Sequence, residues 1–250
     1  MAMARPGCPE GEHVPAFAPH PADRFFYAAM SVVAAAVIVA GFASTYGPKV
    51  LSGSPAVPLV IHLHAALFAC WLALFVAQTL LVMRGHVLAH MRLGRAGMVL
   101  AGLMLATGVA AAVHAGRAGH RGIPGVEFPT SDGFLLLNVA SVSVFAVLAA
   151  AGWWWRRRPQ AHKRLMLAAT VAGLMPPGIS RLPGVAGHDG AIAGLAVAFL
   201  LVGPVYDLAT RRRVHVAYTG LLLAVLIVPP VVLQLSRTGA WRAIAAWMTG

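Results

Sequence analysis

Histidine is the residue type in this sequence whose number and spacing could support chemistry. Eleven histidines occur in 250 residues, of which only 10% are charged. The first group flanks short basic segments and consists of His86, His90, His162 and His215. Neutral imidazole is the commonest metal ligand in proteins and also binds haem iron. These positions are therefore the first candidates for a cofactor site.

Two of these histidines lie in a repeated motif, R-x5-H-x-R-L. The motif occupies residues 84–93 and 156–165, and a looser copy occupies residues 211–215. Each copy ends one long apolar segment and opens the next, so His90 and His162 hold equivalent places in two hairpins. Two imidazoles from different helices would suit a b-type haem.

Three interpretations of this group stay open. In the first, Arg92 or Arg164 pairs with the propionates of a haem bound by two histidines. In the second, three imidazoles and a water hold a catalytic zinc. Its ligands would come from His86, His90, His162 and His215. In the third there is no cofactor, because histidine and arginine at helix ends also bind lipid phosphates.

A second group of histidines lies at the opposite ends of the apolar segments. It consists of His62, His64, His114, His120 and His188. His62 and His64 are two residues apart, so on a helix they point in nearly opposite directions. His64 with His114 could hold a second haem or a copper ion.

Three polar residues lie within or at the end of apolar segments: Gln78, Asn138 and Arg181. Exposing such polar side chains to lipid is unfavourable in free energy, so we expect them to face the interior of a helix bundle. Gln78 and Asn138 would join helices by hydrogen bonds. Arg181 could bind an anionic headgroup, a propionate or a quinone oxygen, or extend to the membrane interface.

Composition places the chain in a membrane. Hydrophobic residues make up 59% of it and the mean hydropathy is +0.78, which leaves too little polar surface for a soluble domain. The net charge of +12 is concentrated at the ends of apolar segments, where it would meet anionic lipid rather than nucleic acid. Two cysteines, Cys8 and Cys70, provide no disulfide framework.

Seven segments are long and apolar enough to cross a bilayer as helices. They cover residues 25–46, 57–83, 95–114, 133–155, 164–182, 191–209 and 215–236. The predicted fold class is an all-α, seven-helix transmembrane bundle at residues 24–236. A polar, Pro-rich and disordered tail (1–23) precedes it, and a short interfacial tail (237–250) follows it. Prolines remove ladder hydrogen bonds in the last three helices, at Pro176-Pro177, Pro204 and Pro229-Pro230. Such breaks can border a cavity or a site, but at any single one we expect a kink that neighbouring helices absorb.

Basic residues set the predicted orientation. The loops after the second, fourth and sixth segments hold three, five and three of the nineteen lysines and arginines. Short loops rich in lysine and arginine stay on the cytoplasmic side. The sequence therefore predicts a multi-pass protein of a cytoplasmic membrane, with the amino end inside and the carboxyl end outside.

Two of the histidine motifs carry a family resemblance. His64 is followed by H-M-R-L-G-R at residues 90–95 and by H-K-R-L-M at 162–166, with Arg181 fifteen residues later. Across residues 57–183 the chain resembles a family of uncharacterised bacterial multi-pass membrane proteins, a domain of unknown function. The resemblance implies a helical membrane fold and singles out these residues, but it supplies no reaction.

The resemblance has departures. Gly97 stands where that family has an aromatic residue, and Ala168 and Thr170 replace an arginine and a tyrosine. The arrangement of helix-end histidines also looks like that of the b561-type haem membrane proteins.

Three functional hypotheses follow from these observations. The first is a redox protein with b-type haem, whose electron partner would be a quinone or another membrane subunit. The second is a zinc-dependent intramembrane lipid hydrolase, similar to the adiponectin-receptor and ceramidase type but without its H-x-x-x-H in the final helix. The third is a cofactor-free carrier or accessory subunit that binds anionic lipid at its inner arginine loops.

Overall fold

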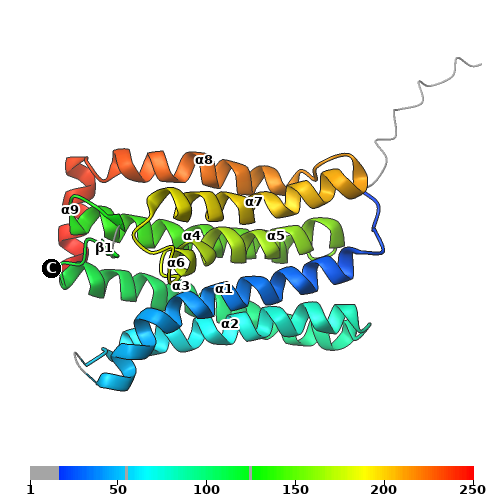
Figure 1. The fold of residues 1–250 in the computed structure, drawn as a ribbon, viewed down its shortest axis with the longest axis horizontal. Coiled ribbons are helices and arrows are strands. Elements are labelled where there is room, and N and C mark those ends of the chain that lie inside the picture. The colour runs from blue at the N-terminus through cyan, green and yellow to red at the C-terminus, as the bar shows by residue number, and fades with distance from the viewer. Residues whose placement is uncertain (1–16, 54–55, 124–125) are drawn as a thin grey trace, which may run out of the picture.

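The computed structural model describes residues 17–53, 56–123 and 126–250. Its long helices lie side by side along one axis (Figure 1), and the short helix α9 crosses one end of the bundle beside the carboxyl terminus. The helices are α1 (Asp23–Ser52), α2 (Leu59–Met83), α3 (Val87–Arg117), α4 (Ser131–Trp154), α5 (Pro159–Gly173), α6 (Met175–Ile179), α7 (Asp189–Arg211), α8 (Ala217–Leu235) and α9 (Gly239–Thr249).

Six of the described helices are long and apolar enough to span a membrane. They are α1, α2, α3, α4, α7 and α8. Their uniformly apolar composition leaves many large hydrophobic side chains exposed, such as Val39, Leu88 and Leu226. Lipid is the environment that such a surface requires. The expected class, an all-helical multi-pass membrane protein, is confirmed at this level.

The predicted span at 164–182 consists of two helices, α5 and α6, which are separated at Leu174. Pro176 and Pro177 have no N–H to donate, so the carbonyls of Ala172 and Gly173 lose their helical partners there. The expected break is therefore present at this position.

At the other two proline positions the helix continues, which agrees with the interpretation that neighbouring helices absorb the kink. Pro204 lies inside the continuous helix α7, and Pro229-Pro230 lies inside the continuous helix α8. A proline removes one hydrogen bond of the ladder, and the rest of the helix and its neighbours hold the backbone in place.

The first histidine motif also differs from the predicted loop. The helix α2 ends at Met83, and α3 begins at Val87 after a turn in which Gly85 has a φ of 80°. The residues that follow are good helix formers, so α3 starts eight residues before the predicted span at 95. His90 therefore lies on α3.

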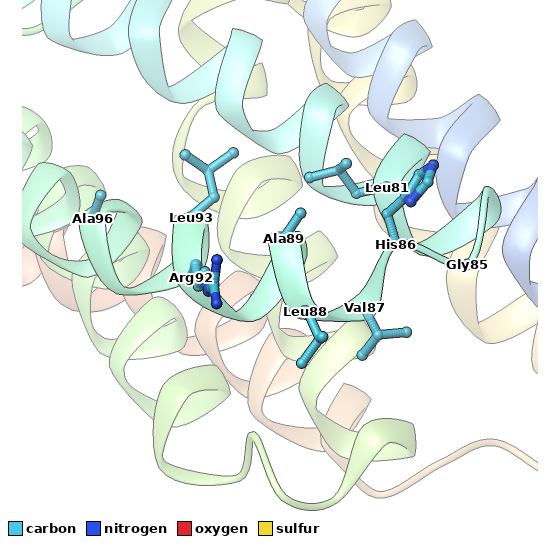
Figure 2. A pocket seen from close by; sticks show the side chains of 9 residues that line it. All are labelled: Leu81, Gly85, His86, Val87, Leu88, Ala89, Arg92, Leu93 and Ala96. Atoms are coloured by element: carbon cyan, nitrogen blue, oxygen red, sulfur yellow. The ribbon is translucent and has the colours of Figure 1, made fainter.

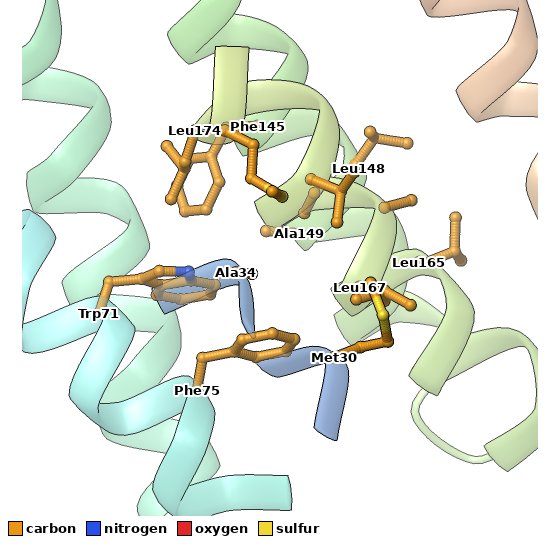
Figure 3. Packing of buried hydrophobic residues seen from close by; sticks show 14 of the residues in the cluster. Met30, Ala34, Trp71, Phe75, Phe145, Leu148, Ala149, Leu165, Leu167 and Leu174 are labelled. Carbon is orange, nitrogen blue, oxygen red and sulfur yellow. The ribbon is translucent and has the colours of Figure 1, made fainter. Parts of the chain in front are cut away.

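Aromatic residues from several helices form the centre of the core (Figure 3). Trp71 of α2 contacts Phe145 of α4 edge to face, with ring centroids 4.8 Å apart. Its indole Nε1 donates to Thr170 Oγ1 of α5 at 3.3 Å. Met30 and Ala34 of α1 complete this layer. The contacts fix α5 against α2 and α4, and α5 carries His162 and Arg164.

The connection after α3 contains two short strands, β1 (Gly122–Ile123) and β2 (Val126–Glu127). They pair antiparallel in the register Gly122 to Glu127 and Ile123 to Val126. At this same end α9 is held by hydrogen bonds that involve Trp241 and Arg117. The Trp241 Nε1 donates to the Asp132 carbonyl at 2.8 Å, and the Arg117 Nε donates to the Thr249 carbonyl at 3.0 Å.

Candidate functional site

His90 and His162 lie next to each other at one end of the bundle. His90 lies in the first turns of α3 and His162 in the first turn of α5, and both helices pack against α4. The two ring centroids are 6.1 Å apart and the ring planes are nearly perpendicular, at 79°. Both side chains are half-buried. The equivalent positions in the sequence repeat are thus brought together in space.

The His162 ring is oriented by the backbone of α4. Its Nδ1 lies 2.8 Å from the carbonyl oxygen of Gly152. A carbonyl oxygen only accepts hydrogen bonds, so Nδ1 carries the proton and donates. The Nε2 atom then keeps its lone pair, which is the form that binds a metal, and metal-binding histidines typically have such a backbone or carboxylate partner.

Two further polar atoms near His90 lack hydrogen-bond partners. The Nδ1 of His90 and the Oε1 of Gln78 are buried, and neither atom has a partner among the described residues. Gln78 of α2 packs against Gly94, one turn beyond His90 on α3. Most buried polar atoms in proteins are paired, so unpaired ones mark a place where a ligand or water completes the structure.

The predicted set of four histidines does not meet. His86 is exposed in the turn before α3. His215 precedes α8 and packs edge to face on Phe17, with centroids 4.7 Å apart. Within the described ranges, no three side chains of histidine, cysteine, aspartate or glutamate lie close enough to hold one metal ion. The pair of His90 and His162 is the part of the set that comes together.

Arg164 belongs to a buried ion pair. Its Nε donates to Asp207 Oδ2 at 2.8 Å and its Nη2 to Asp207 Oδ1 at 2.5 Å, and both side chains are 0% exposed. Its Nη1 donates to the Gln160 carbonyl at 2.7 Å. The predicted propionate partner Arg164 is therefore already occupied by a carboxylate of its own chain. This fork-shaped geometry is the one that arginine and carboxylate favour.

A second carboxylate extends the charged network. Asp23, the first residue of α1, accepts from Lys163 at 2.5 Å, from Arg211 at 2.6 Å and from the Tyr206 hydroxyl at 2.9 Å. Arg211 also lies 3.5 Å from Asp207. The network joins the ends of α1, α5 and α7. Reasoning from the sequence missed Asp23, whose only signal was its position before the first apolar segment.

Phe17 covers this network from outside the helices. Its ring lies 4.4 Å from the guanidinium of Arg164, 5.2 Å from that of Arg211 and 5.0 Å from that of Arg213. Guanidinium groups favour such positions over an aromatic face. The predicted disordered tail includes Phe17, while residues 1–16 of that tail, with Cys8, lie outside the described residues.

His215 also packs against Phe17. Its Nδ1 accepts from the backbone N–H of Ala217 at 3.0 Å, at the start of α8. Burial and the nearby cations Arg164 and Lys163 lower the pKa of His215 below its ordinary value. The neutral ring is thus the form that fits the structure.

Arg92 faces a different side of α3 from His90. Two residues along a helix rotate the side chain by about 200°, and Arg92 lines a surface groove with Leu81, Leu88 and Leu93 (Figure 2). The groove has a volume of about 800 Å³. Neither His90 nor His162 lines it.

The predicted outer histidines His62 and His64 contact different aromatic residues. His64 packs on Phe68, with ring centroids 4.1 Å apart, and its buried Nδ1 lacks a partner among the described residues. His62 bonds instead to the Tyr46 hydroxyl at 2.5 Å. His114 is half-buried in the last turn of α3. The contacts found here do not join His64 to His114, and their shared cofactor stays a prediction.

Arg181 follows α6 and contacts Pro177 and Phe42. Its Nη1 donates to the Pro177 carbonyl at 2.6 Å, and its guanidinium lies 4.8 Å from the centre of the Phe42 ring. The ion pairs of the described residues involve other side chains. Its predicted role in binding an anion or a quinone oxygen stays a prediction.

The fold and these contacts define a class, a multi-pass helical membrane protein with paired histidines beside a buried charged network. Comparisons with protein families, with curated proteins and with solved structures find no match to this chain. The family resemblance drawn from the histidine motifs therefore stays a prediction.

Proposed function

We propose that this chain is a redox protein of the membrane in which His90 and His162 bind the iron of a b-type haem. The observation that carries the proposal is the half-buried pair of rings on two helices, 6.1 Å apart. The tautomer imposed on His162 by Gly152 supports it, because the Nε2 of His162 is left as a free ligand.

The separation of the rings is short enough that both imidazoles could hold one metal ion. Metal–nitrogen bonds of imidazole are about 2.0–2.1 Å long. Each ring centre lies about 1 Å beyond its nitrogen, so two imidazoles that share one metal have centroids within roughly 6 Å of each other. A catalytic zinc ordinarily takes three protein ligands. A pair of histidines therefore favours haem over the zinc hydrolase.

A bound haem would supply one-electron transfer. The contribution of this chain is to hold and orient the two imidazoles. The Gly152 carbonyl fixes the His162 ring, and the Arg164–Asp207 pair fixes the first turns of α5 against α7. A quinone or a neighbouring membrane subunit would exchange electrons with the site.

We also propose seven crossings, with α5 and α6 together forming the fifth. The described chain then alternates so that the turn after α2, the turn after α4 and the connection after α7 all lie inside. Their arginines support this orientation, because such loops stay on the cytoplasmic side. The proposed location is a bacterial cytoplasmic membrane, with the amino end inside and the carboxyl end outside.

Absorption spectroscopy tests the haem. The full-length protein is purified in detergent from haem-supplemented cells, and oxidised and dithionite-reduced spectra are recorded with a pyridine haemochrome assay and metal analysis. We expect about one haem b per chain and a Soret band that shifts on reduction. His90→Ala and His162→Ala should each remove most of the haem.

His86→Ala is the matched control, because His86 lies four residues before His90 but is exposed and, among the described residues, forms no metal-binding group with the pair. It should keep the wild-type haem content. Wild-type protein without a Soret band would refute the proposal, and stoichiometric zinc or copper in its place would assign the pair to that metal.

A further inference from the structure

The turn between α2 and α3 carries a groove that the histidine pair does not use. It is lined by Leu81, Gly85, His86, Val87, Leu88, Ala89, Arg92, Leu93 and Ala96 (Figure 2). Among the described residues that line it, His86 and Arg92 carry the polar side chains. The groove runs along α3 from residue 86 to residue 96, a length of about 15 Å for a helix.

The groove lies on the side of α3 that faces away from the core of the helix bundle. Leu88 is 70% exposed and Val87 is 50% exposed. His90, in contrast, lies on the same side of α3 as the buried residues Ala101 and Met104. Exposed leucine and valine side chains beside a basic side chain such as Arg92 are typical of a surface that contacts lipid.

The basic residues of this turn are available to a ligand. Arg84, Arg92 and Arg95 are exposed, and the ion pairs in the described part of the chain involve other residues. In the inner connection after α7, by contrast, arginines already contact other side chains of the protein. Its Arg211 is bound to Asp23 and its Arg213 lies over Phe17.

We propose that this groove binds an anionic phospholipid, with the phosphate at Arg92 and the start of an acyl chain along Leu81, Leu88 and Leu93. The volume of about 800 Å³ suits a headgroup and part of a chain. Charge complementarity selects the occupant, because Arg92 is an exposed cation in a groove whose other lining side chains, apart from His86, are apolar. The site is separate from the proposed haem site, and neither depends on the other.

Native mass spectrometry of the detergent-solubilised chain tests the proposal. The protein is titrated with phosphatidylglycerol or with phosphatidylcholine of the same acyl chains. We expect preferential retention of phosphatidylglycerol. Arg92→Gln should weaken that retention about fivefold, the effect of one basic residue near an anionic headgroup.

Arg157→Gln is the charge-matched control, because Arg157 is also an exposed arginine of an inner turn but does not line the groove. It should retain the lipid as wild type does. Ala89→Trp fills the groove without changing charge and should also weaken retention. Ala110→Trp places the same side chain at an exposed position elsewhere on α3 and should not.

Circular dichroism of each variant verifies that it is folded before lipid is added. Equal losses for Arg92→Gln and Arg157→Gln would overturn the proposal, since binding would then follow net charge alone. Unchanged retention in Ala89→Trp, or equal retention of the two lipids by wild type, would overturn it as well.

Discussion

Arg164 of α5 and Asp207 of α7 form a bidentate ion pair in which neither side chain is exposed to solvent. Two charges can be buried in this way only when they neutralise each other and their remaining atoms are hydrogen-bonded. Here Gln160 takes the third donor of the arginine, and the backbone N–H of His215 donates to Asp207 Oδ2 at 3.2 Å. The pair locks the inner ends of α5 and α7 together.

Removing one member of this pair should destabilise the protein strongly. Asp207→Asn leaves the Arg164 guanidinium buried without a counter-charge, at an expected cost of about 3–5 kcal/mol. Thermal unfolding in detergent, followed by circular dichroism, measures the effect. Replacing both residues by leucine should cost less than the single change.

The exposed pair of Arg121 and Glu127 provides the control. Their side chains are 56% and 64% exposed and lie 3.7 Å apart. Exposed pairs contribute about 0–1 kcal/mol, so Glu127→Gln should leave the unfolding midpoint nearly unchanged. Equal effects of Asp207→Asn and Glu127→Gln would show that the buried pair does not hold the helices.

Stability should fall as the solution is acidified, in part through His215. Its folded-state pKa lies below the ordinary value, so below about pH 6.5 the unfolded chain binds more protons than the folded one. The stabilisation is therefore present at neutral pH and is lost as the pH falls. Protonation of Nδ1 would also break its bond from the Ala217 N–H.

Asparagine at this position tests the origin of the effect. The side-chain oxygen of His215→Asn can still accept from Ala217 but does not titrate in this range. The difference between unfolding midpoints at about pH 7.5 and about pH 5.5 should shrink in this variant. His120→Asn, at an exposed position, should keep the wild-type difference. An unchanged pH dependence in His215→Asn would exclude His215 as its source.

Gly41 and Gly178 allow α1 and α6 to approach closely. A Cβ on Gly41 would overlap the carbonyl group of Gly178. Gly41→Ala should therefore lower the free energy of unfolding by about 1–3 kcal/mol, since backbone rather than a flexible side chain must move. Thermal unfolding in detergent measures the loss.

Gly102 is the control for this prediction. It lies in α3 with nothing within 4 Å of an added Cβ. Gly102→Ala should be neutral or should stabilise the helix by up to about 1 kcal/mol. If Gly41→Ala left the free energy of unfolding unchanged, α1 and α6 would be able to move apart there without an energetic penalty.

The proposed orientation predicts which loops react with a membrane-impermeant maleimide. In a background without Cys8 and Cys70, Arg121→Cys should be labelled from outside intact cells. Arg157→Cys should be labelled only after the membrane is permeabilised. Both positions are exposed, so access to reagent depends on the side of the membrane. The reverse labelling pattern would show that the protein has the opposite orientation in the membrane.

Hydrophobicity alone was enough to predict the membrane class and most helices. Length and apolar content limit a chain in lipid to helices with paired backbones, so α1, α2, α4, α7 and α8 follow from local composition. Proline was a weaker guide. The pair Pro176-Pro177 separates α5 from α6, whereas Pro204 is accommodated within α7.

The sequence repeat by itself determined that His90 and His162 hold equivalent places in two hairpins, because a motif fixes a residue's position along its own helix. Only the tertiary structure decided that these two rings meet while His86 and His215 point elsewhere. It also decided that Arg164 is bound to Asp207. Those outcomes depend on how α3, α5 and α7 rotate and pack, and contacts between residues far apart in sequence determine that rotation.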